Sequence, residues 1–343
     1  MGKLPYERMD TNVLESTPEM IHNIPQPDFE QIIAGELAKT DLAEIRKGVS
    51  FVSSSQKHDE VTTTVEDRET GKTYSIRSRF LIACDGAKSR VRQSLGIESE
   101  GEDSYETMMT IHFHANLRPV VGTNIGMLHW LADPEVSGFI IAYDLGGNQA
   151  LICNFDAEKH PSSSWNEDLC LRILRAAVGK SVDIKVLSWR PWILSRKVAN
   201  KYRVGSIFLA GDAAHSFPPT GGLGLNCGIA DVHNLAYRIA ANLQGWGRDS
   251  LLDSYEADRL HVAQINSQQS VKNGKKIFAL LKALGTTEKD TAVARDRLHE
   301  SLRDPERRKK IELEINEQQE HFDNVSIPND LPYPSSPALQ MPK

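Results

Sequence analysis

The sequence predicts an α/β fold with a three-layer domain, an inserted antiparallel sheet and a helical C-terminal part. Two apolar runs that end beside an acid, RFLIACDG at 79–86 and SIFLAGD at 206–212, are typical of buried strands in a parallel sheet, the first covered on both faces. Between them, residues 105–156 contain alternating segments such as TIHFHANL, which indicate antiparallel strands with one packed face. Residues 229–283 have a mainly helical pattern.

The elements before the first of these runs follow from local patterns. Asp28 is expected to cap a helix over residues 28–40, whose apolar residues fall on one face. Residues 49–56 and 60–66 are predicted strands, and the turn ETGK at 69–72 leads into a third strand, TYSIRSR.

The remaining elements flank the second run. A helix is expected near residues 165–179, and a strand through VDIKVLSWRPW at 182–192. A charged helix is expected over residues 305–322, where the basic run 307–310 is paired along the helix with Glu306, Glu312 and Glu314 and forms a solvated face.

Composition and charge exclude several classes of function. The chain has 343 residues and a net charge of −6, so no surface for nucleic acid or anionic membranes is expected. No apolar run reaches the length of a transmembrane segment, and the N-terminus lacks the apolar core of a signal peptide. The four cysteines are scattered without a CxxC pair, which is typical of reduced thiols in a cytoplasmic protein.

The second acid-ended run points to a ligand site. Asp212 follows an apolar strand, and the carboxyl ends of parallel strands are where open α/β sheets bind ligands. The loop PPTGGLGLN at 218–226 offers backbone N–H groups, and a helix beginning near Asn226 would direct its positive end at the ligand. A polyol together with an electron-rich ring or phosphate fits this pattern. The alternative is a structural one, in which Asp212 only caps a tight turn.

Two motifs resemble those of the FAD-dependent aromatic hydroxylases, the family of 4-hydroxybenzoate and phenol hydroxylases. GDAAHSFPPTGGLGLNCGIADVHNLAYRIA, at 211–240, is similar to the family's GD motif. RFLIACDGAKSRVR, at 79–92, is similar to its DG motif, and the block between them looks like the family's substrate-binding sheet. The resemblance implies a Rossmann-like FAD-binding domain and is strongest to monooxygenases of fungal secondary metabolism.

The resemblance also assigns roles to residues. It implies that Asp212 binds the sugar hydroxyl groups of FAD. It also implies that the flavin ring lies along Gly222, Gly224, Leu225 and Asn226.

In the same way, Pro218 and Pro219 are expected on the substrate side of the ring, while Asp85, Gly86 and Arg92 contribute to FAD binding and to the use of NADPH. Arg90 and Arg92 are candidates for the extra phosphate of NADPH, or else lie on an exposed helix face.

The implied activity is a monooxygenase reaction in which NADPH reduces FAD and one oxygen atom of O2 is transferred to a phenolic or other activated aromatic substrate. No catalytic side chain is identified from the sequence, and a homodimer is a possible assembly. The alternative is a non-catalytic remnant of such an enzyme that binds FAD poorly and acts as an interaction protein.

One departure from the family pattern concerns the glycine-rich dinucleotide motif. No GxGxxG occurs upstream of Asp85, and GLG at 222–224 and GWG at 245–247 do not directly follow strands. We therefore expect an FAD-binding domain that is incomplete at its N-terminus, with the missing unit either supplied by a partner segment or lost from the sequence.

The resemblance and the composition together predict five segments. They are 1–103, the partial FAD-binding domain with the DG motif; 104–200, the antiparallel substrate domain; 201–245, the GD segment; 246–322, a helical region; and 323–343, a tail.

Smaller features have structural interpretations. His112 and His114 share a strand face without a third ligand, so no metal site is expected. His215 is expected to fix the GD loop rather than to act as a base, and Cys84 to be an inert core thiol. Trp189, Arg190 and Trp192 either line a substrate pocket or pack against the sheet.

Overall fold

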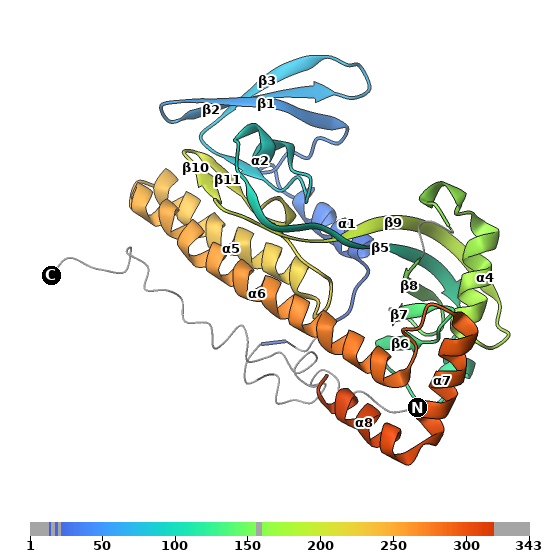
Figure 1. Cartoon of the computed structure of the whole chain (residues 1–343). Helices are drawn as coiled ribbons and strands as arrows, with labels where there is room; N and C mark the ends of the chain where they lie inside the picture. The colour runs from blue at the N-terminus through green and yellow to red at the C-terminus, as the bar shows by residue number, and fades with distance from the viewer. Residues whose placement is uncertain (1–13, 15–17, 20–21, 156–159, 319–343) are drawn as a thin grey trace. The chain divides into compact units, whose positions relative to one another are not determined.

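The computed structural model describes residues 14, 18, 19, 22–155 and 160–318, and these form two compact units (Figure 1). The first unit holds the described residues up to Thr40 together with Ser104–Leu194 and residues 275–318. The second holds Asp41–Asp103 and Ser195–Gly274. Among the described residues, the helices are too short or too polar to cross a membrane.

An antiparallel three-stranded sheet opens the second unit. It consists of β1 (Val49–Lys57), β2 (Glu60–Asp67) and β3 (Thr73–Ser78), in that order. The turn after β2 is fixed by Asp67, whose carboxylate accepts hydrogen bonds from the backbone N–H groups of Glu69 and Thr70 at 2.9 Å each. These strands confirm the pattern that the sequence predicts.

The two acid-ended runs become neighbouring parallel strands. β4 (Leu81–Ala83) pairs in parallel with β11 (Ile207–Leu209), and β10 (Arg203–Val204) pairs antiparallel with β11 on its other side. β11 is fully buried and belongs to the main core of the unit.

The expectation that β4 is buried on both faces is wrong. Only Ala83 is buried, while Ile82 is 43% exposed and Cys84 is exposed. β4 is the last strand in the order β10-β11-β4, and successive side chains point to opposite faces, so one face packs on the core and the other does not. Cys84 is therefore a surface thiol and not a core residue.

Two long helices lie side by side in the second unit (Figure 1). α5 spans Leu223–Leu243 and begins three residues before Asn226, and α6 spans Asp249–Leu284, with its residues from Lys275 on in the first unit. A buried ion pair joins them, because Arg238 Nη2 lies 2.5 Å from Asp258 Oδ2. The short helix α2 (Arg90–Ser94) follows β4.

The first unit contains the antiparallel sheet predicted for the middle of the chain. Its strands are β5 (Ser99–Ala115), β6 (Leu128–Ala132), β7 (Ser137–Ala142), β8 (Asn148–Asn154) and β9 (Ile184–Ala199). They follow the order β9-β5-β8-β7-β6, and β5 and β9 continue into the second unit, where β12 (His215–Ser216) pairs with Lys197 and Val198 of β9.

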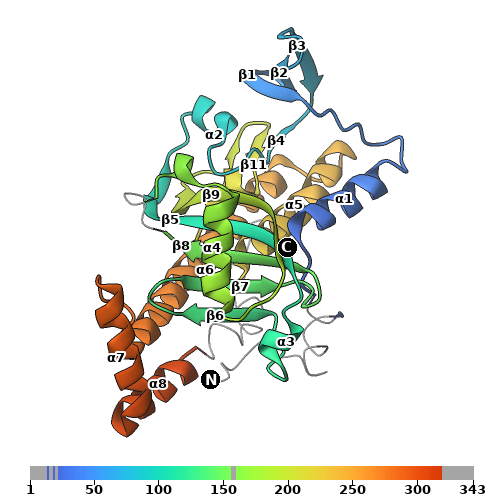
Figure 2. The ribbon, with the colours of Figure 1, turned by 90° about the vertical axis from the view of Figure 1, so that its right-hand side faces the viewer.

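The helix α4 (Glu167–Val178) packs on one face of this sheet (Figure 2). Asn166 caps it by accepting a hydrogen bond from Leu169 N at 2.9 Å, and Gly179 ends it in the left-handed conformation at φ 68°. Leu169, Leu174 and Val178 face the sheet core.

The other helices of the first unit differ in detail from the sequence predictions. α1 spans Gln26–Leu37, so Asp28 lies in its first turn and does not cap it; Pro25 is the N-cap, and the next proline can enter the first turn because its missing N–H has no partner there. α3 spans Arg118–Val121, α7 spans Thr291–Arg303 within the predicted helical region 246–322, and α8 spans Pro305–Asn316.

The two units divide the chain differently from the five predicted segments. The break after Asp103 coincides with a predicted boundary, whereas the helical residues 246–322 fall partly in each unit. The whole predicted tail, 323–343, and residues 319–322 of the predicted charged helix lie outside the described residues.

Candidate functional site

The candidate site lies at the carboxyl ends of β4 and β11, within the second unit. The parallel register pairs Ala83 with Leu209, and Ala210 N continues the ladder by donating to Ala83 O at 3.0 Å. Asp85 and Asp212 therefore follow adjacent strand ends, where open α/β sheets bind ligands.

Asp212 is an exposed acid in the 3-10 turn η3 (Gly211–Ala213). Its carboxylate makes no hydrogen bond or ion pair within the described part of the chain. Partial desolvation raises the pKa of Asp212, and the positive charge of His215 acts in the opposite direction. Both oxygens are thus free to accept hydrogen bonds from a ligand.

The loop between Asp212 and α5 is held in place by α6. Ser270 Oγ donates to Pro218 O at 2.5 Å, and Thr220 Oγ1 donates to Ser270 O at 2.6 Å. The turn closes through Gly222 N, which donates to Pro219 O at 2.9 Å. Pro218 is buried and Pro219 is exposed.

The N-terminus of α5 has no side-chain cap. Gly222 occupies the N-cap position with φ 67°, a conformation that favours glycine, and its missing side chain leaves the first N–H groups of a 21-residue helix without a capping acceptor. A Cβ atom added to Gly222 or Gly224 would have nothing within 4 Å. A flat, electron-rich group can therefore approach this helix end closely.

Leu225 and Asn226 occupy the first turn of α5. Leu225 is 52% exposed and offers an apolar surface next to the free N–H groups. Asn226 Nδ2 donates to Gly222 O at 2.9 Å, so this side chain fixes the glycine turn.

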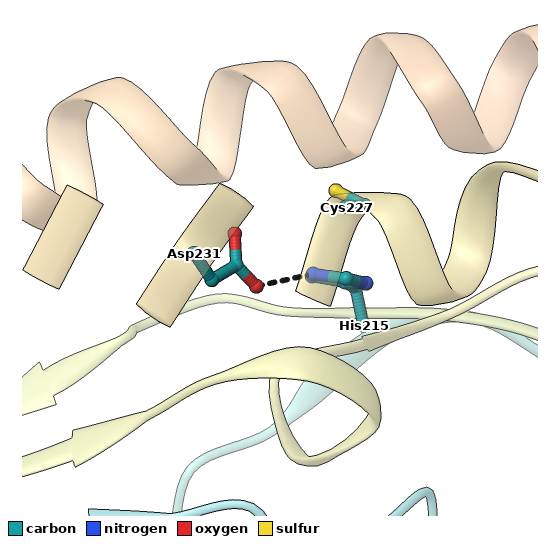
Figure 3. A group of neighbouring side chains, drawn as sticks. All are labelled: His215, Cys227 and Asp231. Carbon is teal, nitrogen blue, oxygen red and sulfur yellow. Dashed lines mark hydrogen bonds and ion pairs between the residues drawn. The ribbon is translucent and has the colours of Figure 1, made fainter. Parts of the chain in front are cut away.

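Asp231 is a buried acid that the sequence analysis missed. It lies on α5 and accepts hydrogen bonds from Gly211 N at 3.0 Å and from Arg259 Nε of α6 at 2.7 Å. It also accepts a hydrogen bond from His215 Nε2 at 2.7 Å (Figure 3). It thereby ties the residue before Asp212 to both long helices. The sequence contains only a weak signal for the role of Asp231, because a single acid in a helical pattern does not indicate its partner Arg259, 28 positions away.

His215 is buried and positively charged. Burial alone lowers the pKa of His215, but the hydrogen bond to Asp231 and the neighbouring Cys227 outweigh it and raise the pKa to about 10. The pKa of Asp231 is correspondingly lowered against the effect of burial. The imidazole ring of His215 stacks on Phe217, and His215 Nδ1 has no hydrogen-bond partner among the described residues. His215 therefore fixes the loop, in the role that the sequence predicts.

His215, Cys227 and Asp231 also form a group with metal-ligand chemistry, since their ligand atoms lie within 4.8 Å of one another (Figure 3). A cation is already present: the guanidinium of Arg259 contacts Asp231 Oδ1 at 2.7 Å and Cys227 Sγ at 3.4 Å. A divalent ion would have to displace this guanidinium, so we interpret the group as an ion-pair cluster.

The DG loop uses its polar side chains differently. Asp85 Oδ2 accepts hydrogen bonds from Arg90 N at 2.8 Å and from Val91 N at 3.2 Å, at the start of α2. Ser89 caps the same helix through a bond from Arg92 N at 2.9 Å. Gly86 adopts φ 83° and has open space where a side chain would be.

Arg92 connects the two loops of the site. Its guanidinium is buried and donates to Ala213 O and Ala87 O, each at 2.7 Å. Burial lowers the pKa of Arg92, and the nearby Asp85 opposes this effect. Arg90, in contrast, is exposed.

The predicted site residues that follow β4 and β11 are thus brought together in the second unit. The histidines of β5 and the tryptophans of β9 that the sequence analysis considered lie in the first unit. His112 and His114 share a face of β5, as predicted. Trp192 is half-buried and donates to Thr110 Oγ1 at 2.9 Å, while Trp189 is 38% exposed.

The chain belongs to the FAD binding domain family, whose model matches residues 2–270. It is 34% identical over 266 residues to tetracenomycin B2 monooxygenase-dioxygenase of Streptomyces olivaceus, which covers 77% of this chain and 49% of that protein. It is 32% identical to 2,4-dichlorophenol 6-monooxygenase of Cupriavidus pinatubonensis over 73% of this chain and 43% of that protein. The chain thus spans about half the length of the curated relatives it matches.

Solved structures support the same assignment. The flavin-dependent monooxygenase PieE in complex with FAD and substrate has a TM-score of 0.83 at 25% identity, over 94% of this chain and 57% of that chain. Aklavinone-11 hydroxylase with FAD and aklavinone has a TM-score of 0.69 at 28% identity, over 76% of this chain and 49% of that chain. The predicted family and the α/β fold class are confirmed.

Proposed function

We propose that the protein is an FAD-dependent monooxygenase that hydroxylates a phenolic or other activated aromatic compound. One observation supports this proposal most: an unpaired acid, Asp212, follows a parallel strand, and the glycine loop that comes after β12 ends at the uncapped N-terminus of α5. A structural cap would have its carboxylate bonded to backbone N–H groups, as Asp85 does.

The residues present fit FAD. Asp212 accepts hydrogen bonds from sugar hydroxyls, and the free N–H groups of the first turn of α5 stabilise negative charge on the flavin ring. The open surfaces of Gly222 and Gly224 allow the ring to approach, and Leu225 offers it an apolar contact. When bound, FAD supplies the redox chemistry that activates O2 and transfers one oxygen atom.

Other residues of the site position this cofactor. Asp231 and Arg92 hold the backbone on either side of Asp212, through Gly211 N and Ala213 O. Preorganisation of this kind keeps the acid in place before the ligand arrives. Asp85 and Gly86 shape the adjacent loop, and Pro218 and Pro219 are proposed to lie on the substrate side.

The substrate, reductant and location are also proposals. Relatives named for tetracenomycin B2 and for 2,4-dichlorophenol support an aromatic substrate, either a phenol or an aromatic polyketide of secondary metabolism. We propose NADPH as the reductant and the cytoplasm as the location. Of the two arginines that follow Asp85, the exposed Arg90 is the candidate for the NADPH phosphate, because both Nη atoms of Arg92 donate to backbone carbonyls.

Titration of FAD into the wild-type chain and into Asp212→Ala tests the proposal. A charge-assisted hydrogen bond contributes about 1.5–3 kcal/mol, so the variant should bind FAD roughly 10- to 100-fold more weakly. Asp253→Ala, at an exposed acid of the same unit, is the control and should bind FAD like the wild type. NADPH-dependent oxygen consumption with a panel of phenols then tests the activity.

Two results would contradict the proposal. A wild-type chain that binds no FAD would contradict FAD binding by this chain and favour the interaction-protein alternative. Equal affinity of the wild type and Asp212→Ala would remove Asp212 from the site. Equal rates with NADH and NADPH would remove only the assigned reductant.

A further inference from the structure

The helix α5 has an apolar stripe on its surface. Five residues recur at alternating steps of three and four, which places them on one side of the helix. They are Ile229, Val232, Ala236, Ile239 and Leu243, here named the α5 stripe. The side chains of Ile229, Val232 and Leu243 are exposed, and Ile239 is only partly buried. A spacing that averages 3.5 residues is the one with which one helix packs along another, so the α5 stripe is shaped for a helix.

The exposed surface of α5 carries no charge that would oppose an apolar partner. Among its 21 residues, all of them described, the only Asp, Glu, Lys or Arg side chains are Asp231 and Arg238, and both are buried. Both pair with residues of α6, which lies along α5 (Figure 1). A helix that faces water normally carries charged side chains on its solvent side. The surface of α5 is therefore suited to contact with another apolar helix.

Trp246 lies just beyond the end of α5, three residues after the last member of the stripe. Its side chain is exposed, and its Nε1 donates to Gln244 Oε1 at 2.8 Å. Large aromatic side chains are frequent anchors of protein interfaces. Trp246 is also the only tryptophan in the second unit, since the other four lie between residues 130 and 192. Its fluorescence therefore reports on this unit alone.

A second open surface lies at the edge strand β4. Leu81 N donates to Ser206 O at 3.0 Å, and Ala83 O accepts a hydrogen bond from Ala210 N, also at 3.0 Å. Leu81 and Ala83 thus direct their backbone groups at β11. Ile82, between them, directs its N–H and C=O to the opposite side, because successive residues of a strand alternate. β4 is the last strand of this sheet in the described part of the chain, so the backbone of Ile82 has no strand partner there.

The two open surfaces are neighbours. Burial and the charges of Asp85 and Asp231 raise the pKa of the Cys84 thiol, which places the end of β4 near the middle of α5. Leu235 of α5 also shares a core with β11. A strand added parallel to β4 needs a crossover connection, usually a helix, that packs on a face of the sheet beside the helices already there. One strand–helix segment therefore matches both surfaces, whereas a strand or a helix alone matches one.

We propose that the edge of β4 and the α5 stripe bind one segment of a separate polypeptide, in which an apolar strand is connected to a helix with an uncharged apolar face. The strand pairs with the backbone of Ile82, and the helix packs its apolar side chains between those of the α5 stripe. Backbone pairing fixes the register of such a segment, and burial of apolar surface supplies its affinity. Both contacts lie within the second unit.

A synthetic peptide with this architecture, added to the full chain, tests the proposal. It has an apolar strand of about six residues, a glycine turn and a helix as long as the α5 stripe, with leucines on one side. The emission of Trp246 should shift to shorter wavelength and saturate at an equimolar ratio, and Trp246→Phe should show no such shift. Ile229→Glu places a charge in the α5 stripe and should weaken binding by about 30-fold or more.

Matched variants separate the two surfaces from general effects. Tyr237→Glu adds the same charge at an exposed position of α5 outside the stripe, and should bind the peptide like the wild type. Ile82→Pro removes the N–H that faces the open edge and breaks no bond to β11, so it should weaken binding by about 5-fold. Ile82→Thr keeps this N–H and should bind normally. The helical part of the peptide alone should bind Ile82→Pro and the wild type equally.

Several results would overturn the proposal. One is the absence of peptide binding, and another is an equal loss in Ile229→Glu and Tyr237→Glu. Normal binding of the whole peptide to Ile82→Pro would remove β4 from the surface.

Two other results would give the α5 stripe a different occupant and overturn the proposal as well. If the chain sediments as a dimer that Ile229→Glu dissociates, a second copy covers the stripe. If Ile229→Glu lowers the denaturant midpoint far more than Tyr237→Glu does, the chain itself covers the stripe. None of these measurements requires FAD, so their failure would leave the proposed function standing.

Discussion

The loops after β4 and β11 are built from similar sequences but use their acids differently. Each loop places an aspartate and a glycine after an apolar strand, and the two strands are parallel neighbours. Asp85 binds the backbone N–H groups of Arg90 and Val91, whereas Asp212 binds no described residue. The comparison shows that an acid at a strand end becomes a candidate ligand-binding group only where another residue fixes the loop in its place.

For the β11 loop that other residue is Asp231 of α5, whereas the β4 loop is held by Ser89 and Arg92, which are close to it in the chain. Asp231 is fully buried and holds Gly211 N, His215 and Arg259 at once. The loop after β4 is fixed locally, by caps on the five-residue helix α2. Substitutions at the two loops should therefore lower the free energy of unfolding by very different amounts.

The largest effect is expected from Asp231→Ala. The substitution leaves the buried cations His215 and Arg259 without a counter-charge, so the free energy of unfolding should fall by about 3–5 kcal/mol, as measured by denaturant unfolding. Asp253→Ala is the control: it breaks an ion pair with Arg203 in which the acid is 70% exposed, and should cost less than about 1 kcal/mol. Equal losses would show that the Asp231 cluster does not stabilise the loop.

The second effect concerns pH. His215 has a pKa raised to about 10, above the ordinary value of 6.5, so the folded state binds more protons than the unfolded state between these values. Its stabilising contribution is complete below pH 6.5 and is lost as the pH rises through about 10. Denaturant midpoints over this range should fall in the wild type and fall less in His215→Gln. The same slope in both proteins would contradict a charged His215.

The parts of the site that the sequence predicted are those encoded locally. The strand before Asp212 and the glycine loop before α5 follow from an apolar run and from turn residues next to each other in the chain. The interaction of Asp231 with Arg259 joins two helices, and helical periodicity identifies a buried face without identifying the partner on it.

Exposure was predicted less well than element type. An apolar run looks the same whether one face or both faces are covered, which is why Ile82 and Cys84 were expected in the core and are exposed. The helix α7 was predicted only as part of a helical region, without bounds of its own, because only Ala294 and Ser301 are buried and its apolar pattern is weak. The expectation of an incomplete FAD-binding domain stays a prediction.

The third effect contrasts two glycines of α5. A Cβ atom on Gly228 would lie 3.3 Å from Gly211 Cα, so Gly228→Ala should push the β11 loop away and cost about 1–3 kcal/mol in unfolding free energy. Gly224→Ala has nothing within 4 Å and should stabilise the helix by up to about 1 kcal/mol. It should nevertheless weaken FAD binding, because the methyl group occupies the surface offered to the ring. Thermal unfolding and FAD titration of both variants check the opposite signs, and a stabilised Gly228→Ala would contradict the close contact.

The smallest effects return to the two acids. Asp85→Ala removes a cap from α2 and should lower the unfolding free energy by about 1 kcal/mol, with only a modest effect on FAD affinity. Asp212→Ala should leave stability unchanged or slightly raised, because desolvation raises the pKa of this acid and its charge is not compensated by a bond. The same substitution should weaken FAD binding strongly. We therefore expect opposite results for the two variants. Denaturant unfolding should show a loss of stability in Asp85→Ala, and FAD titration should show a loss of affinity in Asp212→Ala. If both variants lost stability and affinity in the same proportion, the two acids would have the same role, and the distinction between a bonded and an unbonded strand-end acid would fail.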